Sequence, residues 1–150
     1  MELNGETLRF IREHCKDDVR SLALQAPKYP DVDMPVALTQ IAGRQAAAEK
    51  IPSWHEEEGV LYPRHLSLEQ CSSEATARYK ASIIPESSSG TLTDLTGGFG
   101  IDCAFLSPKF HHVTYVERQE VLCEIASHNF PLLGLNHIRI ENKDGIRHLQ

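Results

Sequence analysis

The residues best suited to chemistry in this sequence are a glycine turn and three acids near it. Gly97, Gly98 and Gly100 lie one residue beyond the short segment 91–95. Glycine adopts backbone angles that other residues avoid, and it lets a ligand approach the main chain closely. The helix that follows such a turn offers unpaired N–H groups to an anionic group. A glycine turn alone is a weak signal, so its neighbours must decide what it binds.

Acids stand at or just beyond the ends of three expected strands. Asp94 would repel the pyrophosphate of a dinucleotide, and it suits a ligand with a positive centre such as an amino-acid ammonium. Glu117 can accept hydrogen bonds from both hydroxyls of a ribose through its two oxygens. Asp144 is placed to accept from an exocyclic amine. Together these acids describe a nucleoside with a cationic tail.

Two other functions fit the glycine turn less well but stay open. The nicotinamide fingerprint requires a third Gly or Ala, and this chain has Cys103 at that position. A nucleotide- or NAD-binding domain of an oxidoreductase is therefore disfavoured. A catalytically silent interaction module would keep the turn for architecture alone.

Hydrophobic periodicity places these residues in an α/β arrangement. Three β-rich segments alternate with two segments of helical spacing, and each change falls at a turn signal. The predicted strands are 91–95, 111–117 and 136–141, and the predicted helices are 101–107 and 119–133. This βαβαβ order predicts the first half of a Rossmann-like sheet, with its ligand site at the carboxyl ends of the strands.

Residues 1–85 predict a separate helical N-terminal region, divided by the polar stretch 86–90 from a partial Rossmann-like domain over 91–150. Its apolar spacing and capping residues indicate four helices. They are expected from about Thr7 to Cys15, between Asp18 and Pro27, from Pro35 to Ile51, and over 74–81. The pattern is poor between Pro52 and Leu68, where the acidic run 56–58 predicts a solvated loop.

Composition excludes several classes of protein. Fifteen Lys and Arg against 21 Asp and Glu give a net charge of −6, so this stretch is a poor nucleic-acid binder on its own. The sequence has neither a signal peptide nor an apolar membrane span, which makes a cytoplasmic location the expectation. Four scattered cysteines predict free thiols. His111 and His112 would point to opposite faces of a strand, so no metal site is expected.

At these residues the chain resembles the class I S-adenosylmethionine-dependent methyltransferases. Their first motif matches Asp94-Leu95-Thr96-Gly97-Gly98-Phe99-Gly100, their acidic second motif matches Glu117, and their third matches Asp144-Gly145. The resemblance implies that Asp94 and the 97–100 backbone hold the methionine moiety of S-adenosylmethionine, Glu117 the ribose and Asp144 the adenine amine. Asp102 would contact the methionine end or cap the next helix. The remaining expected cofactor contacts are Thr96, Phe99, Arg118 and Gly145.

More narrowly, segments 68–81 and 94–102 resemble bacterial multidomain methyltransferases that have a helical N-terminal region and a C-terminal THUMP-like domain. This resemblance implies RNA or another nucleic acid as substrate. Gln70, Ser72 and Ser73 could line the cofactor pocket, although an N-cap role explains Ser72 better. Arg78 and Lys80 would face substrate phosphate or complete a surface helix.

Class I methyltransferases have seven strands, whereas this chain ends soon after the third. It also contains no Asn-Pro or Asp-Pro dipeptide of the kind that often ends their fourth strand. We therefore expect an N-terminal fragment with most of the cofactor site, and its catalytic residues are unknown. Without a fourth strand, residues 91–95 would form an exposed edge that favours a homodimer.

Overall fold

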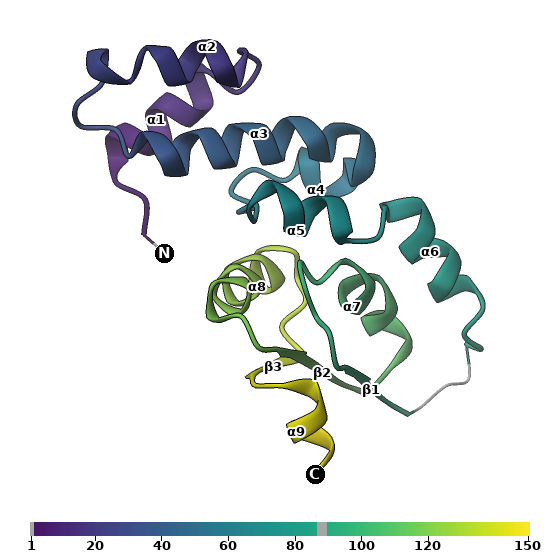
Figure 1. The fold of residues 1–150 in the computed structure, drawn as a ribbon. Helices are drawn as coiled ribbons and strands as arrows, with labels where there is room; N and C mark the ends of the chain where they lie inside the picture. Colours follow the sequence, from purple (N-terminus) through teal and green to yellow (C-terminus); the bar gives the residue numbers. More distant parts are fainter. Residues whose placement is uncertain (1, 87–89) are drawn as a thin grey trace.

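The computed structural model describes residues 2–86 and 90–150. The chain begins with three helices, labelled in Figure 1: α1 (Gly5–Glu13), α2 (Val19–Leu24) and α3 (Met34–Lys50). Their N-caps are Asn4, Asp18 and Asp33, whose side chains each accept a hydrogen bond from the N–H three residues later. These helices enclose a small core formed by Phe10, Leu22, Met34, Ala37 and Ile41.

The segment between α3 and the sheet holds three more helices, α4 (Pro52–Glu56), α5 (His65–Gln70) and α6 (Glu74–Ser82). Helix α6 confirms the prediction for 74–81, but α4 and α5 lie where an irregular stretch was expected. Both are a turn or two long, and neither has a side-chain N-cap of its own. The first turn of α4 is capped from α6 instead, because Glu74 Oε1 accepts from Ser53 N at 3.3 Å. Because this cap comes from a residue far along the chain, the sequence around α4 does not predict the helix.

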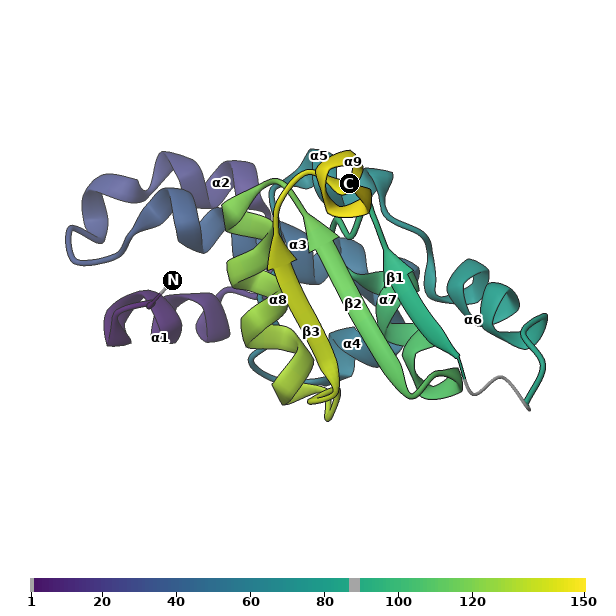
Figure 2. The same ribbon diagram turned by 90° about the horizontal axis from the view of Figure 1, so that it is seen from below.

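Three parallel strands form one sheet in the order β1-β2-β3. Their bounds are Thr91–Asp94 for β1, His112–Glu117 for β2 and Ile138–Asn142 for β3. Helices α7 (Ile101–Leu106) and α8 (Glu120–Leu132) lie between the sheet and the N-terminal helices, while α9 (Gly145–Leu149) lies on the other face (Figures 1 and 2). The α/β fold class and the βαβαβ order are therefore confirmed. Part of the polar stretch 86–90 lies outside the described residues.

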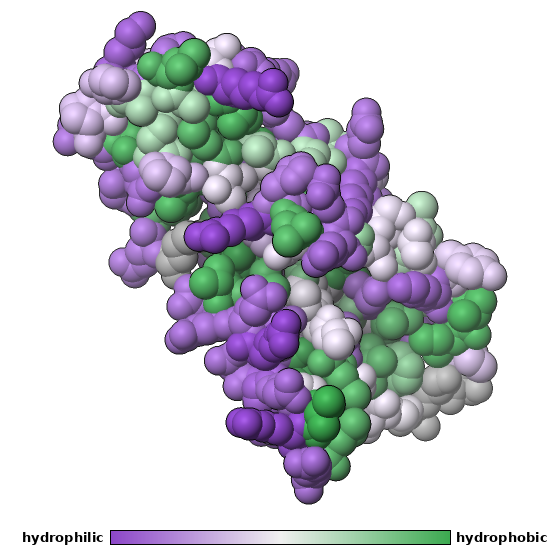
Figure 3. Space-filling view, in the orientation of Figure 1, coloured by the Kyte–Doolittle hydropathy of each residue, from purple (hydrophilic) through white to green (hydrophobic). Residues whose placement is uncertain are grey.

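Short elements account for the remaining differences from the predictions. The 3₁₀ turns η1 (Ala26–Lys28) and η2 (Ser107–Lys109) extend α2 and α7 at prolines, where an α-helix cannot continue. Helix α9 was not predicted, and its Ile146 and Leu149 side chains are exposed. Figure 3 shows hydrophobic surface at the end of the molecule that α9 occupies in Figure 1. Within the described chain, no helix is both long and apolar enough to cross a membrane.

The larger core joins the sheet to the second half of the helical region. Trp54 and Tyr62 from the helical region pack with Phe99, Tyr115 and Phe130 from the sheet and its helices. Phe99 has its ring centroid 5.1 Å from that of Trp54 in an edge-on arrangement. Apolar contacts thus cross the division predicted near residue 85, although that domain assignment itself stays a prediction.

Two buried side-chain amides hold the extended segment 60–63 between α3 and α8. Asn129 Oδ1 accepts from Leu61 N at 2.9 Å, and its Nδ2 donates to Leu61 O at 2.8 Å. Gln40 makes the same pair with Tyr62, accepting from its N at 2.8 Å and donating to its O at 3.0 Å. The two amides thus replace the neighbouring strands that would pair with this backbone in a sheet.

We predict that Asn129→Ala lowers the free energy of unfolding by about 2 kcal/mol, because it leaves the Leu61 N–H and C=O without partners. Urea unfolding followed by circular dichroism measures the change. Asn136→Ala, at an exposed turn position, is the matched control. Equal stabilities of the two variants would show that the Asn129 hydrogen bonds contribute nothing.

Strand β1 stands at the edge of the sheet. Among the residues placed by the structure, it pairs only with β2. An unpaired strand edge can accept another chain. The homodimer expected through this edge stays a prediction.

Candidate functional site

A cavity of about 340 Å³ opens at the carboxyl ends of β1 and β2. One wall is the glycine loop 96–100 with the start of α7, and another is formed by Glu117 and Gln119. A third wall comes from the helical region, through the end of α5 and the turn that follows it. The cavity lies where ligands bind in open α/β sheets, and both regions of the chain contribute to it.

The glycine loop lies directly on Tyr115. Gly97 N donates to Val116 O at 2.9 Å, and Tyr115 Oη donates to Gly98 O at 2.5 Å. Burial raises the pKa of Tyr115, so its hydroxyl stays protonated and can donate this bond. Gly98 and Gly100 have φ of +55° and +90°, which only glycine adopts without strain. The glycine loop therefore needs Tyr115, a residue that the sequence pattern assigns only to a strand.

Glu117 connects the glycine loop to the start of α8. Its side chain is buried, Oε2 accepts from Gly98 N at 3.0 Å, and Oε1 accepts from Gln119 N at 2.8 Å. A carboxylate oxygen can accept more than one hydrogen bond, so both oxygens keep capacity for a ligand hydroxyl. The predicted ribose contact is compatible with this arrangement.

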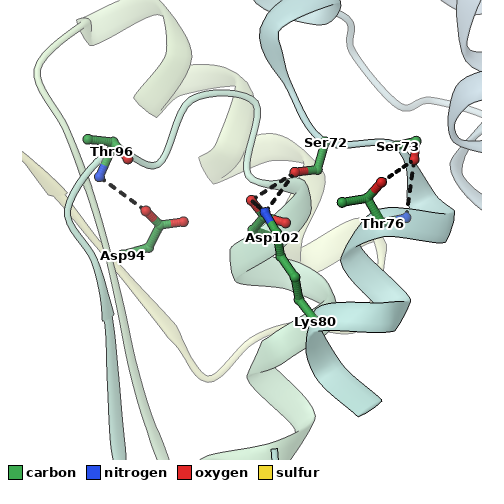
Figure 4. Close-up of polar contacts among 7 residues, drawn as sticks. All are labelled: Ser72, Ser73, Thr76, Lys80, Asp94, Thr96 and Asp102. Atoms are coloured by element: carbon green, nitrogen blue, oxygen red, sulfur yellow. Dashed lines mark hydrogen bonds and ion pairs between the residues drawn. The ribbon is translucent and has the colours of Figure 1, made fainter. Parts of the chain in front are cut away.

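Asp94 places a carboxylate in the cavity. Its Oδ1 accepts from Thr96 N at 3.1 Å (Figure 4). Burial raises the pKa of Asp94, and the charges of Asp102 and Glu117 raise it further. All three acids line the cavity. Their mutual repulsion is relieved by a positively charged ligand and would be increased by a phosphate.

We predict that Asp94→Asn stabilises the unliganded protein but weakens binding of a cationic ligand. The pKa of Asp94 is higher in the folded protein than in the unfolded chain. Ionisation of Asp94 therefore lowers the stability of the folded protein as the pH rises above the unfolded-state pKa and through the folded-state pKa. The stability gain of the variant should therefore be present at neutral pH and disappear as the pH falls below about 4. Binding should weaken about 10- to 100-fold.

Thermal unfolding across that pH range, together with ligand titration, measures both effects. Asp31→Asn removes an exposed carboxylate outside the cavity and serves as the matched control. A variant that loses stability at neutral pH would contradict the argument from burial.

Asp102 lies at the contact between α7 and α6. Its Oδ2 accepts from Ser72 Oγ at 3.0 Å and from Lys80 Nζ at 2.9 Å (Figure 4). Its Oδ1 is buried and has no hydrogen-bond partner in the described part of the chain. Asp102 makes no capping bond to α7, so of its two predicted roles the helix cap is wrong. The N-cap explanation of Ser72 is also wrong, because Ser73 caps α6 and Ser72 lines the cavity.

The other predicted contacts fall into two groups. Thr96 and Phe99 line the cavity, but the Phe99 ring packs into the core. Arg118, Asp144 and Gly145 are not among the lining residues. Asp144 Oδ1 caps α9 by accepting from Ile146 N at 2.9 Å and Arg147 N at 3.3 Å. Its predicted contact with the adenine amine, like the roles of Arg118 and Gly145, stays a prediction.

Several residues line the cavity without having been foreseen. They lie on α5 or directly after it, at the start of α7 and around the start of α8, and their positions depend on contacts between distant segments. These residues are Ser67, Cys71, Ile101, Gln119 and Leu122. Among the described residues, no group of three or more His, Cys, Asp or Glu side chains could hold a metal ion.

Parallel strands alternating with helices, with a glycine loop at the strand ends, define the Rossmann-like class of α/β proteins. Among solved structures, the chain is similar to a protein of Porphyromonas gingivalis W83 described as a "putative methyltransferase", with 29% sequence identity and a TM-score of 0.75. The match covers 95% of this chain and 36% of that protein, so this chain resembles one part of it. No protein-family model and no curated protein matches the sequence.

Proposed function

We propose that the cavity binds S-adenosylmethionine and that the chain forms the cofactor-binding part of a methyltransferase. The observation that carries this proposal is the pair of acids on either side of the glycine loop, Asp94 and Glu117, both lining one cavity. The structural similarity to part of a methyltransferase-like protein supports it. Dinucleotides fit less well, because three carboxylates around the loop would repel a pyrophosphate.

Different residues bind different parts of the cofactor in this proposal. Asp94 binds the ammonium of the methionine moiety, and the main chain of the loop 97–100 gives this moiety close access. Glu117 accepts from the ribose hydroxyls through the lone pairs that Gly98 N and Gln119 N leave free. Asp144 accepts from the adenine amine through the oxygen that is not engaged in capping α9.

When bound, S-adenosylmethionine supplies an electrophilic methyl group on a positively charged sulfur. The protein's part is to orient this group and to stabilise its charge through the surrounding carboxylates. Asp94, Asp102 and Glu117 line the cavity and provide the negative field. The cofactor has net positive charge and its demethylated product does not, so the cavity favours the cofactor more strongly.

The methyl acceptor that we propose is RNA or another nucleic acid, in keeping with the resemblance of segments 68–81 and 94–102. The net charge of −6 makes this chain a poor surface for a phosphate backbone. The acceptor would therefore be bound by parts of the protein outside this chain, which spans 36% of the similar protein's length.

Isothermal titration of S-adenosylmethionine, S-adenosylhomocysteine and NAD into the protein tests the proposal. We expect saturable binding of the first two ligands and loss of that binding in Asp94→Ala and Glu117→Ala. Asp31→Ala, outside the cavity, should bind like the wild type. Binding of NAD alone would favour an oxidoreductase domain, and no binding of any ligand would favour a silent interaction module. Either result would overturn the proposal.

A further inference from the structure

A positive charge lies directly behind the cavity wall that the helical region forms, in contact with two lining residues. Lys80 Nζ lies 2.9 Å from Asp102 Oδ2 and 3.2 Å from Ser72 Oγ. Ser72 and Asp102 both line the cavity, whereas the lining includes no lysine or arginine in the described chain. Figure 4 shows Lys80 reaching toward Asp102 from α6 while Asp94 lies at the end of β1. The ammonium of Lys80 and the carboxylate of Asp94 thus come from different elements of the chain.

The lysine is held in place but keeps a donor. An ammonium has three N–H groups, and two of them suffice for Asp102 and Ser72. Nζ has no further partner in the part of the chain that the structure describes. The side chain is about half-exposed, so the ion pair by itself adds little stability. The pair with Asp102 therefore fixes the ammonium in position and leaves one N–H for a ligand.

An amino-acid tail needs two opposite charges close together. Its ammonium and carboxylate are attached to the same carbon, so a site that holds both must present an anion and a cation side by side. Asp94 provides the anion, and it lines the same cavity as Asp102. Lys80 Nζ contacts Oδ2 of Asp102, so the cation lies at the edge of the cavity that Asp94 and Asp102 line.

We propose that Lys80, positioned by Asp102 and Ser72, binds the carboxylate of the amino-acid tail while Asp94 binds its ammonium. This inference rests on the proposed function, since it assumes that S-adenosylmethionine occupies the cavity. It makes the helical region responsible for selecting ligands with a complete amino-acid tail, because Lys80 lies on α6. A nucleoside that lacks the carboxylate would gain nothing from this residue.

Comparing two ligands that differ only in the carboxylate tests this inference directly. S-adenosylmethionine and decarboxylated S-adenosylmethionine are titrated into wild type and Lys80→Met. We expect the variant to bind S-adenosylmethionine at least about 10-fold more weakly, whereas its affinity for the decarboxylated ligand changes by less than about twofold. Lys16→Met, a change of equal charge at an exposed position in the turn between α1 and α2, should leave both affinities unchanged. Thermal unfolding of each variant confirms that it is folded.

Each other outcome overturns the inference in a recognisable way. An equal loss of affinity for both ligands would make Lys80 a structural contact between α6 and α7. No loss for either ligand would remove Lys80 from the site. If wild type bound neither ligand, the proposed function itself would fail, and the inference that rests on it would fail as well.

Discussion

Replacing Gly97 by alanine is expected to lower the free energy of unfolding by about 3 kcal/mol or more and to abolish ligand binding. A Cβ atom at this position would lie 2.2 Å from Cε2 of Tyr115 and 2.5 Å from Cδ2. The Tyr115 ring cannot move aside, because it is fully buried, contacts Phe130 edge-on and donates to Gly98 O. The alanine must therefore displace the glycine loop, and with it the cavity wall.

Chemical unfolding and calorimetric titration measure the two effects of Gly97→Ala. The matched control is Gly5→Ala at the start of α1, where a Cβ would have no neighbour within 4 Å and alanine favours the helix. The control should be as stable as wild type or slightly more stable. Wild-type stability in Gly97→Ala would mean that the loop does not need to rest on Tyr115.

The second large effect is expected for Glu117→Ala. This change removes the acceptor of both Gly98 N and Gln119 N, which should cost about 2 to 5 kcal/mol of folding free energy. The proposed ribose contacts disappear with the same side chain, so affinity for S-adenosylmethionine should fall at least about 100-fold. The two losses have one cause, because the same carboxylate shapes the loop and faces the ligand.

Glu117→Gln separates the two roles. Its one carbonyl oxygen can still accept from one of the two backbone N–H groups, but its NH₂ group faces the other N–H and cannot accept from it. We therefore expect intermediate stability and a loss of affinity close to that of alanine. Glu58→Ala, at an exposed turn position, controls for the lost charge. Full affinity in Glu117→Gln would exclude a ligand contact through the carboxylate.

The sequence predicted the elements whose signals are local. Strand β2 and helix α8 carry clear periodicity, and α8 ends as expected before Gly134, whose φ is +75°. The grouping of Asp94 and Glu117 followed from topology, because parallel strands bring their carboxyl ends to one edge of the sheet. The Asp102 helix cap was a wrong prediction because a short acid near a helix start has several possible partners, and Lys80 and Ser72 are distant in sequence.

Long-range contacts define the parts that the sequence did not reveal. Helices α4 and α5 are too short to show periodicity, and the cap of α4 comes from Glu74 on α6. Tyr115 was assigned only to a strand, since nothing local shows that a glycine loop rests on its ring. The third wall of the cavity was only partly foreseen, because the positions of α5 and the turn after it depend on how the helical region packs on the sheet.

The paired amides of Gln40 and Asn129 have a consequence for how the chain can be divided. They attach one extended segment, 60–63, to α3 on one side and to α8 on the other. Trp54 and Tyr62 also join the helical region to the sheet, because both belong to the larger core. The helical region and the sheet should therefore unfold as one cooperative unit. If one region were replaced by that of another protein, the amide and aromatic residues that contact it from the other region would have to be replaced as well.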